Sequence, residues 1–273
     1  MDTINEGKLV HVARAAIQSM NGKTIRLSDG ATVETDALIF ATGWKLSSTE
    51  IFKPSLRAEL GLPTPLDQYP PADSAYWKSL DSAADAEILK IYPLFSNPHK
   101  EIPVRECSDT RFRLFRTIIP PKLAVKNDRS IVFLGNLANA QQATYAEVST
   151  LWSIAYLEGL LPDMIVGNQE TMDKEIALTN AFSMRRYAGR GGNRPNALLD
   201  IRDWNDLLMR DLGLRTDRKR LSYERSSDSG WGWWGLKAWK KEWFEPYVPQ
   251  DYRGIVADFI EKANRDSEAR KTK

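Results

Sequence analysis

The sequence has few of the residues that build metal centres and disulfides. It contains one cysteine, Cys107, and two histidines, His11 and His99, among 273 residues. A single cysteine excludes a disulfide or a thiolate cluster within the chain. Two histidines are too few for a multi-histidine metal centre. The sequence therefore predicts no metal site.

Strong net charge and long apolar runs are lacking as well. The 38 basic and 36 acidic residues leave a net charge of +2, which gives no reason to expect nucleic acid as a partner. No apolar run approaches the roughly 20 residues that cross a bilayer. The first residues lack the basic and apolar regions of a signal peptide. These features favour a reducing, cytoplasmic location.

Glycine, proline and hydrophobic spacing divide the chain into expected elements. Proline-rich stretches at 45–72 and 92–121 predict irregular structure. Apolar residues at helical spacing predict helices at 73–91, 138–159, 168–187, 200–212 and 251–265. Asp73-Ser74 is the expected N-cap of the first helix. Strands are expected at 8–13, in a hairpin at 23–35 that turns at Ser28-Asp29-Gly30, at 37–40 and at 131–135.

Two of these expected strands end in the same way. Ala37–Phe40 runs into Ala41-Thr42-Gly43-Trp44, and Ile131–Leu134 runs into Gly135-Asn136 ahead of a helix. Taken singly, each is an ordinary core strand with a terminal glycine. Taken in order, strand, glycine and helix are also typical of a nucleotide-binding layout.

The ordered pair, with the hairpin and Asp36 ahead of the first strand, resembles flavin-containing monooxygenases. The segments Leu114–Pro121, Asp211–Leu214 and Glu245–Tyr252 resemble fungal members of that group. The resemblance covers only the C-terminal portion of the family's organisation. It implies an α/β fold: an incomplete two-dinucleotide-binding flavoprotein fold, with a β-hairpin, sheet strands, flanking helices and a helical C-terminal extension. The implied regions are the end of the NAD(P)-binding domain and return strand (1–44), the C-terminal part of the FAD-binding domain (45–165) and a Trp-rich extension (166–273).

The resemblance also implies a function and a site. A member of this family uses NADPH to reduce FAD and then oxygenates a small organic molecule with O2. Asn136 stands where Asp is usual in two-domain flavoproteins, and its amide could still bond a ribityl hydroxyl. No catalytic residue is assigned, because the cofactor supplies the chemistry. The residues implied to contact the cofactor are Thr42, Gly43, Trp44, Gly135, Asn136, Gln142, Ala143 and Thr144.

A convincing glycine-rich phosphate loop is missing. Gly230–Gly235 matches Gly-x-Gly-x-x-Gly by letter, but three tryptophans fill its variable positions and no buried strand precedes it. Gly189–Gly192 follows a helical pattern and fails too. We therefore expect a truncated monooxygenase that lacks the region with this loop, or one whose missing half comes from a separate chain. Two alternatives stay open: a non-catalytic remnant, and an interaction protein that uses its Trp-rich segment. The lack of a Cys-x-x-x-x-Cys pair argues against a disulfide oxidoreductase.

The Trp-rich segment 231–247 has three possible roles. It could pack against its own domain, form a partner surface, or make a peripheral membrane contact. Tryptophans interleaved with Lys237, Lys240 and Lys241 suit a membrane surface, whereas Glu242 and Glu245 argue against one. Packing is the favoured interpretation from the sequence.

Overall fold

The computed structural model describes residues 6–7, 9–12, 14–39, 51–97, 107–138, 142–162, 164–187, 197–225 and 233–271. The chain divides into two compact units, Met1–Leu46 and Ser47–Lys273. Each unit is described below by itself.

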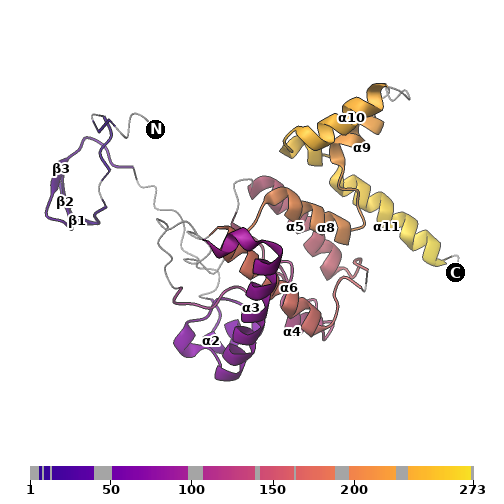
Figure 1. Ribbon diagram of the computed structural model, residues 1–273, viewed down its shortest axis with the longest axis horizontal. Coiled ribbons are helices and arrows are strands. Elements are labelled where there is room, and N and C mark those ends of the chain that lie inside the picture. Colours follow the sequence, from indigo (N-terminus) through magenta and orange to yellow (C-terminus); the bar gives the residue numbers. More distant parts are fainter. Residues whose placement is uncertain are drawn as a thin grey trace. The chain divides into compact units, whose positions relative to one another are not determined.

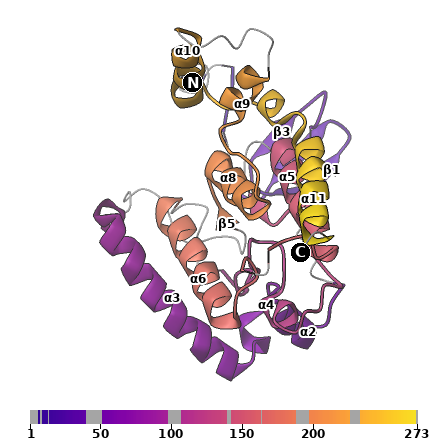
Figure 2. The ribbon, with the colours of Figure 1, turned by 90° about the vertical axis from the view of Figure 1, so that its right-hand side faces the viewer.

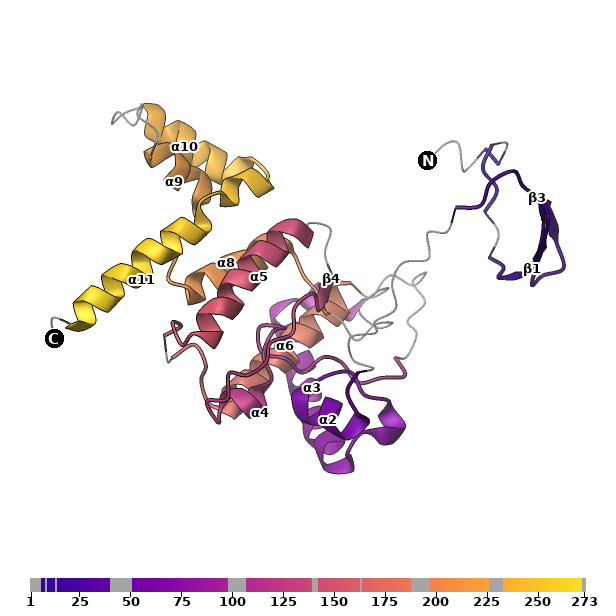
Figure 3. The same cartoon turned by 180° about the vertical axis from the view of Figure 1, so that it is seen from behind.

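The first unit holds a three-stranded antiparallel sheet (Figure 3). Its strands are β1 (Ile17–Asn21), β2 (Thr24–Leu27) and β3 (Thr32–Glu34). The hairpin predicted at 23–35 is confirmed, with Ile25 opposite Val33. Its turn forms as the sequence indicates, because Gly30 adopts a φ of 88° and the Asp29 carboxylate accepts the Ala31 N–H at 2.9 Å.

Two other strands expected in this unit are not formed where the structure describes them. Residues 9–12 and 37–39 carry no strand, and Leu38 and Ile39 are exposed. Within the described part of the sheet only Ile25 is buried. Among the described residues of this unit, no second layer packs on the sheet to order a further apolar strand. Thr42, Gly43 and Trp44 lie outside the described residues.

The second unit is mainly helical. The predicted helices at 73–91, 138–159, 168–187, 200–212 and 251–265 are confirmed, with shifted ends. Short 3₁₀ helices cover Leu66–Gln68 (η2), Pro93–Ser96 (η3) and Pro249–Tyr252 (η4). The α-helices are α2 (Pro54–Leu60), α3 (Pro71–Ile91), α4 (Pro121–Ala124), α5 (Gln142–Leu157), α6 (Gln169–Arg186), α8 (Ile201–Asp211), α9 (Arg218–Glu224), α10 (Trp233–Phe244) and α11 (Ile255–Lys271).

Helix ends follow local chemistry, with one correction. The N-cap Asn168 accepts the Thr171 N–H at 2.9 Å and so satisfies a free donor in the first turn of α6. The cap predicted at Asp73-Ser74 is wrong, because α3 begins two residues earlier at Pro71. Proline suits a first helical position, since its fixed φ is already helical and the N–H it lacks would have no partner.

The strand predicted at 131–135 is also wrong. Residues 131–134 carry no strand, and the Phe133 N–H donates instead to the Ile118 carbonyl at 2.8 Å. A two-residue strand, β4 (Leu137–Ala138), follows and pairs in parallel with β5 (Ala197–Leu198). A short apolar run fits a half-buried loop as well as a strand, so the pattern alone did not distinguish them.

The core lies between the helices of this unit. Helix α3 lies along α6 (Figure 2), and α5 lies along α8 (Figure 1). The largest fully buried side chains include Trp152 and Tyr145 on α5, Met172 on α6 and Leu208 on α8. No helix among the described residues has the length and apolar character needed to span a bilayer.

Candidate functional site

An unusual turn contacts Asn136, one of the predicted cofactor residues. Arg116 and Thr117 both have a φ of 52°, in the left-handed region that side chains disfavour. The turn is closed by Phe115, whose N–H donates to the Ile119 carbonyl at 2.8 Å. Two non-glycine residues in this conformation cost roughly 1–3 kcal/mol each, so the surrounding contacts must hold the turn.

A buried ion-pair cluster holds it. The Arg116 guanidinium donates to both carboxylate oxygens of Asp211 on α8, at 2.7 and 3.2 Å, and also pairs with Glu175 on α6. Asp211 accepts a third hydrogen bond, from the Trp152 indole N–H of α5 at 3.0 Å. Burial raises the pKa of Glu175, and Arg116 acts against that rise. We call Arg116, Trp152, Glu175 and Asp211 the Arg116 cluster; it ties the turn to three helices.

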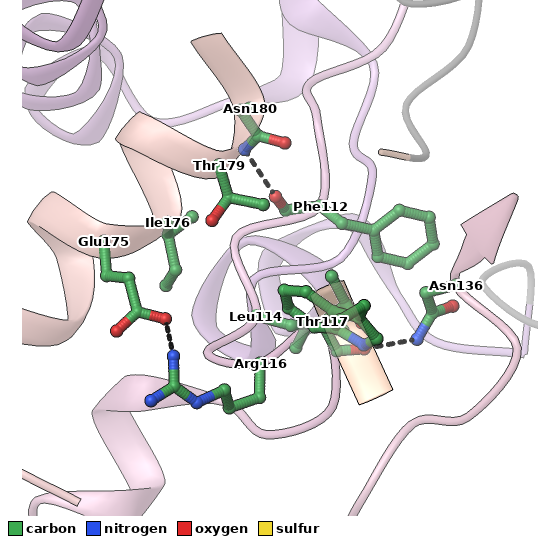
Figure 4. Close-up of a pocket in the computed structure, with 10 residues that line it drawn as sticks. Phe112, Leu114, Arg116, Thr117, Asn136, Glu175, Ile176, Thr179 and Asn180 are labelled. Carbon is green, nitrogen blue, oxygen red and sulfur yellow. Dashed lines mark hydrogen bonds and ion pairs between the residues drawn. The ribbon is translucent and has the colours of Figure 1, made fainter. Parts of the chain in front are cut away.

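A small cavity lies beside this cluster (Figure 4). Its volume is about 10 Å³, which is the size of a single water molecule. Thr117, Glu175 and Asn180 are among its lining residues, and the Asn180 amide donates to the Phe112 carbonyl at 3.1 Å. The cavity is too small for a flavin ring, so a cofactor would have to lie outside it.

Asn136 has a structural role in the region where the sequence predicts cofactor contact. Its side-chain amide donates to the Thr117 carbonyl at 3.2 Å and to the Phe133 carbonyl at 3.1 Å. The side chain is buried and fastens the left-handed turn to the loop before β4. An ionised aspartate cannot donate either bond. These two carbonyls therefore explain why an amide and not a carboxylate stands at position 136.

Gly135 presents open backbone next to it. Gly135 is exposed with a φ of 81°, and an added side chain would meet no atom of the described residues within 4 Å. A glycine in this conformation lets a ligand approach the main chain closely. The surface above Gly135 therefore fits the close cofactor approach that the sequence predicts.

The predicted residues of α5 divide into exposed and buried ones. Gln142 and Ala143 are exposed in the first turn, and the Gln142 amide reaches the Leu137 carbonyl at 3.5 Å. Thr144 is buried, and its hydroxyl has no hydrogen-bond partner among the described residues. A ligand at this helix end would meet backbone N–H groups and the positive end of the helix dipole. Thr144 would contribute through its backbone, because its side chain faces inward.

A larger cavity of about 610 Å³ lies between α3 and α6, within the usual size range for a small-molecule pocket. Its lining includes Tyr69, Cys107, Arg111 and Asn180, and Asn180 also lines the small cavity near Asn136. One guanidinium nitrogen of Arg111, Nη1, is buried and has no hydrogen-bond partner among the described residues. Burial lowers the pKa of Arg111. This cavity combines apolar walls with charged residues of both signs, which include Arg111 and the carboxylates Asp81, Asp85 and Asp109.

The Arg116 cluster was not predicted as a functional feature. An arginine between Phe115 and Ile118 is a charge in an apolar segment, and such a charge needs a buried partner. That signal was present in the sequence. Its partner Asp211 lies 95 residues away, so the pairing itself could not be read from the sequence.

Comparisons with known proteins support a flavoprotein relationship. The chain is 32% identical over 261 residues to FAD-dependent monooxygenase rstn6 of Aspergillus nomiae, a match that covers 95% of this chain and 41% of that protein. It is 34% identical over 220 residues to a FAD-dependent monooxygenase of Pyrenophora dematioidea, covering 80% of this chain and 39% of that protein. It is 31% identical over 245 residues to FAD-dependent monooxygenase DEP4 of Alternaria brassicicola, covering 88% and 37%.

The chain thus spans about two fifths of the length of the curated relatives it matches. No family model and no solved structure matches it. The predicted relationship to FAD-dependent monooxygenases is confirmed over most of the chain. The narrower flavin-containing monooxygenase type stays a prediction.

Proposed function

We propose that this chain supplies part of a FAD-dependent monooxygenase that uses NADPH and O2 to oxygenate a small organic molecule. The observation that carries the proposal is its identity of about one third, over most of its length, to proteins of that name. When bound, FAD would supply the oxygen chemistry. The protein's own residues would hold it and exclude water.

In this proposal the flavin end of FAD lies against Gly135 and the first turn of α5. Gly135 offers open backbone, and Ala143 leaves the helix end uncovered by a large side chain. Positive potential at a helix N-terminus favours negative charge on a neighbouring ring. Asn136 acts as a positioning residue, since its amide holds the turn at Thr117 in place.

The proposal is tested by titrating the purified chain with FAD and following flavin absorbance at about 450 nm. Riboflavin should compete with FAD, because the proposed contacts lie at the flavin end. Adenosine monophosphate should not compete, because no phosphate-binding glycine loop is identified in this sequence. Saturable binding with that competition pattern supports the proposal. Failure of both flavins to bind would overturn it and favour the interaction role of the Trp-rich segment.

The substrate would occupy the cavity between α3 and α6. Arg111 lines it together with Asp81, Asp85 and Asp109, which favours a substrate with a polar group that the Arg111 guanidinium can bond. The variant Arg111→Met should weaken binding of such a compound while leaving FAD binding unchanged. Equal loss of both would contradict a separate substrate cavity.

A further inference from the structure

The outer face of α10 carries an exposed aromatic cluster. Trp239, Trp243 and Phe244 are 50%, 66% and 70% exposed. The Trp239 ring lies 6.4 Å from the Trp243 ring and 6.1 Å from the Phe244 ring, measured between centroids. These three large aromatic side chains thus form one patch that is exposed among the described residues. Patches of this kind mark interaction surfaces.

The opposite face of α10 explains how the helix is held. Ala238 and Glu242, one helical turn apart, are both buried. The Glu242 carboxylate accepts hydrogen bonds from Arg202 at 3.3 Å, from the backbone N–H of Arg220 at 3.4 Å and from the Tyr247 hydroxyl. The helix packs against α9 (Figure 1). These contacts turn the charge of Glu242 toward the protein.

The exposed charged residues of α10 are lysines. Lys240 and Lys241 are exposed, and Glu242 is the one acidic residue between 237 and 244. Just beyond the helix, Glu245 lies 3.7 Å from Lys219. Of the two acidic residues that argue against a membrane contact in the sequence, Glu242 is therefore buried and Glu245 is paired. The outer face carries tryptophan, phenylalanine and lysine.

We propose that the outer face of α10 docks this protein on an anionic lipid surface. This site goes beyond the proposed oxygenation and does not depend on it. Tryptophan and phenylalanine favour the boundary between headgroups and acyl chains, and lysine is attracted to anionic headgroups. An acidic protein surface would be attracted to the same lysines, and the vesicle experiment distinguishes it from a lipid surface.

The test is co-flotation of the purified chain with phosphatidylcholine vesicles, prepared with and without phosphatidylserine. We expect binding to the anionic vesicles, a blue shift of tryptophan fluorescence, and weakening by salt. The double variant Lys240→Glu/Lys241→Glu should reduce the affinity by about tenfold or more, because each lysine contributes near the surface. Trp239→Ser/Trp243→Ser should abolish the binding.

Matched controls separate docking from folding. Ile154→Ser on α5 removes a side chain that is 49% exposed and should leave vesicle binding unchanged. Lys78→Glu/Lys90→Glu on α3 applies the same charge change away from α10. Circular dichroism and urea unfolding confirm that each variant is folded. The proposal is overturned if neither vesicle binds, if the α10 variants bind like the controls, or if they change only the oligomeric state.

Discussion

The Arg116 cluster and the outer face of α10 use the same residue types in opposite ways. In the cluster, Trp152 is fully buried and donates to Asp211, and the Arg116 guanidinium is paired with the same carboxylate. On α10, Trp243, Lys240 and Lys241 are exposed, whereas Glu242 is buried and bonded to Arg202. Internal packing accounts for the first arrangement and not for the second. The contrast separates residues that maintain the fold from residues available to a partner.

The largest expected effect comes from the same substitution made in both regions. Trp152→Ala removes a fully buried ring and its hydrogen bond to Asp211, and should cost about 3–5 kcal/mol of unfolding free energy. Trp243→Ala should change that free energy by no more than about 0.5 kcal/mol. Urea denaturation measures both. Similar losses in the two variants would show that the Trp243 side chain packs against the protein and is not exposed.

Breaking the buried ion pairs should have a comparable effect. Arg116→Met leaves Asp211 and Glu175 without their cation, and removing one partner of a buried pair costs about 3–5 kcal/mol. Arg215→Met is the matched control, because Arg215 pairs with Glu224 at an exposed site and should cost less than about 1 kcal/mol. Equal unfolding free energies of the two variants in urea would show that the Arg116 cluster does not stabilise the fold.

Asp206 on α8 predicts a pH dependence of the unfolding free energy. Burial raises its pKa from 3.8 to about 6, and its Oδ1 has no hydrogen-bond partner among the described residues. Between about pH 4 and pH 6 the folded state keeps this proton while the unfolded chain releases it, so the unfolding free energy falls as pH rises. The fall is about 3 kcal/mol at most, at about 1.4 kcal/mol per pKa unit.

The variant Asp206→Asn tests this sign. It should be more stable than the native chain at neutral pH and should lose this part of the pH dependence. Urea unfolding at about pH 4 and pH 7 gives both values. A native chain whose stability rises across that interval, with no change in Asp206→Asn, would contradict the assignment.

The smallest expected effect concerns Asn136. Asn136→Asp replaces a donor to two carbonyls with an acceptor, which should cost about 1–3 kcal/mol at neutral pH and less in acid, where the carboxyl can donate. Asn168→Asp is the control, since an aspartate caps α6 equally well by accepting the Thr171 N–H. Urea denaturation of both variants at acidic and neutral pH shows whether Asn136→Asp destabilises the fold because the donated hydrogen bonds are lost or because any added charge does so.

The sequence predicted α3, α5, α6, α8 and α11 but not α2, α4, α9 or α10, and it predicted the tertiary arrangement of polar groups poorly. Helices such as α3 and α8 were found because apolar spacing and flanking Pro93 and Gly213 mark them locally. The prediction of a strand at 131–135 was wrong because the Phe133 N–H donates to the Ile118 carbonyl in a turn and not to a neighbouring strand. The orientation of Glu242 depends on Arg202, 40 residues away, so the sequence could not show which face of α10 is exposed.

The cofactor contacts predicted at Gly135 and at the start of α5 stay predictions, which rest on a local pattern because these residues lie close together in the sequence. The two carbonyls that Asn136 binds belong to Thr117 and Phe133, and only the folded chain brings them to its amide. The predicted contacts at Thr42, Gly43 and Trp44 stay predictions, because these residues lie outside the described part of the chain.

The central claim is that a flavin approaches this chain at the start of α5, and one matched pair of variants tests it most directly. Ala143 and Ile154 are both exposed on α5, the first in its opening turn and the second near its end. A tryptophan at either position should leave the fold intact. In a FAD titration, Ala143→Trp should abolish binding and Ile154→Trp should leave the native affinity. FAD that binds both variants as it binds the native chain would contradict the claim.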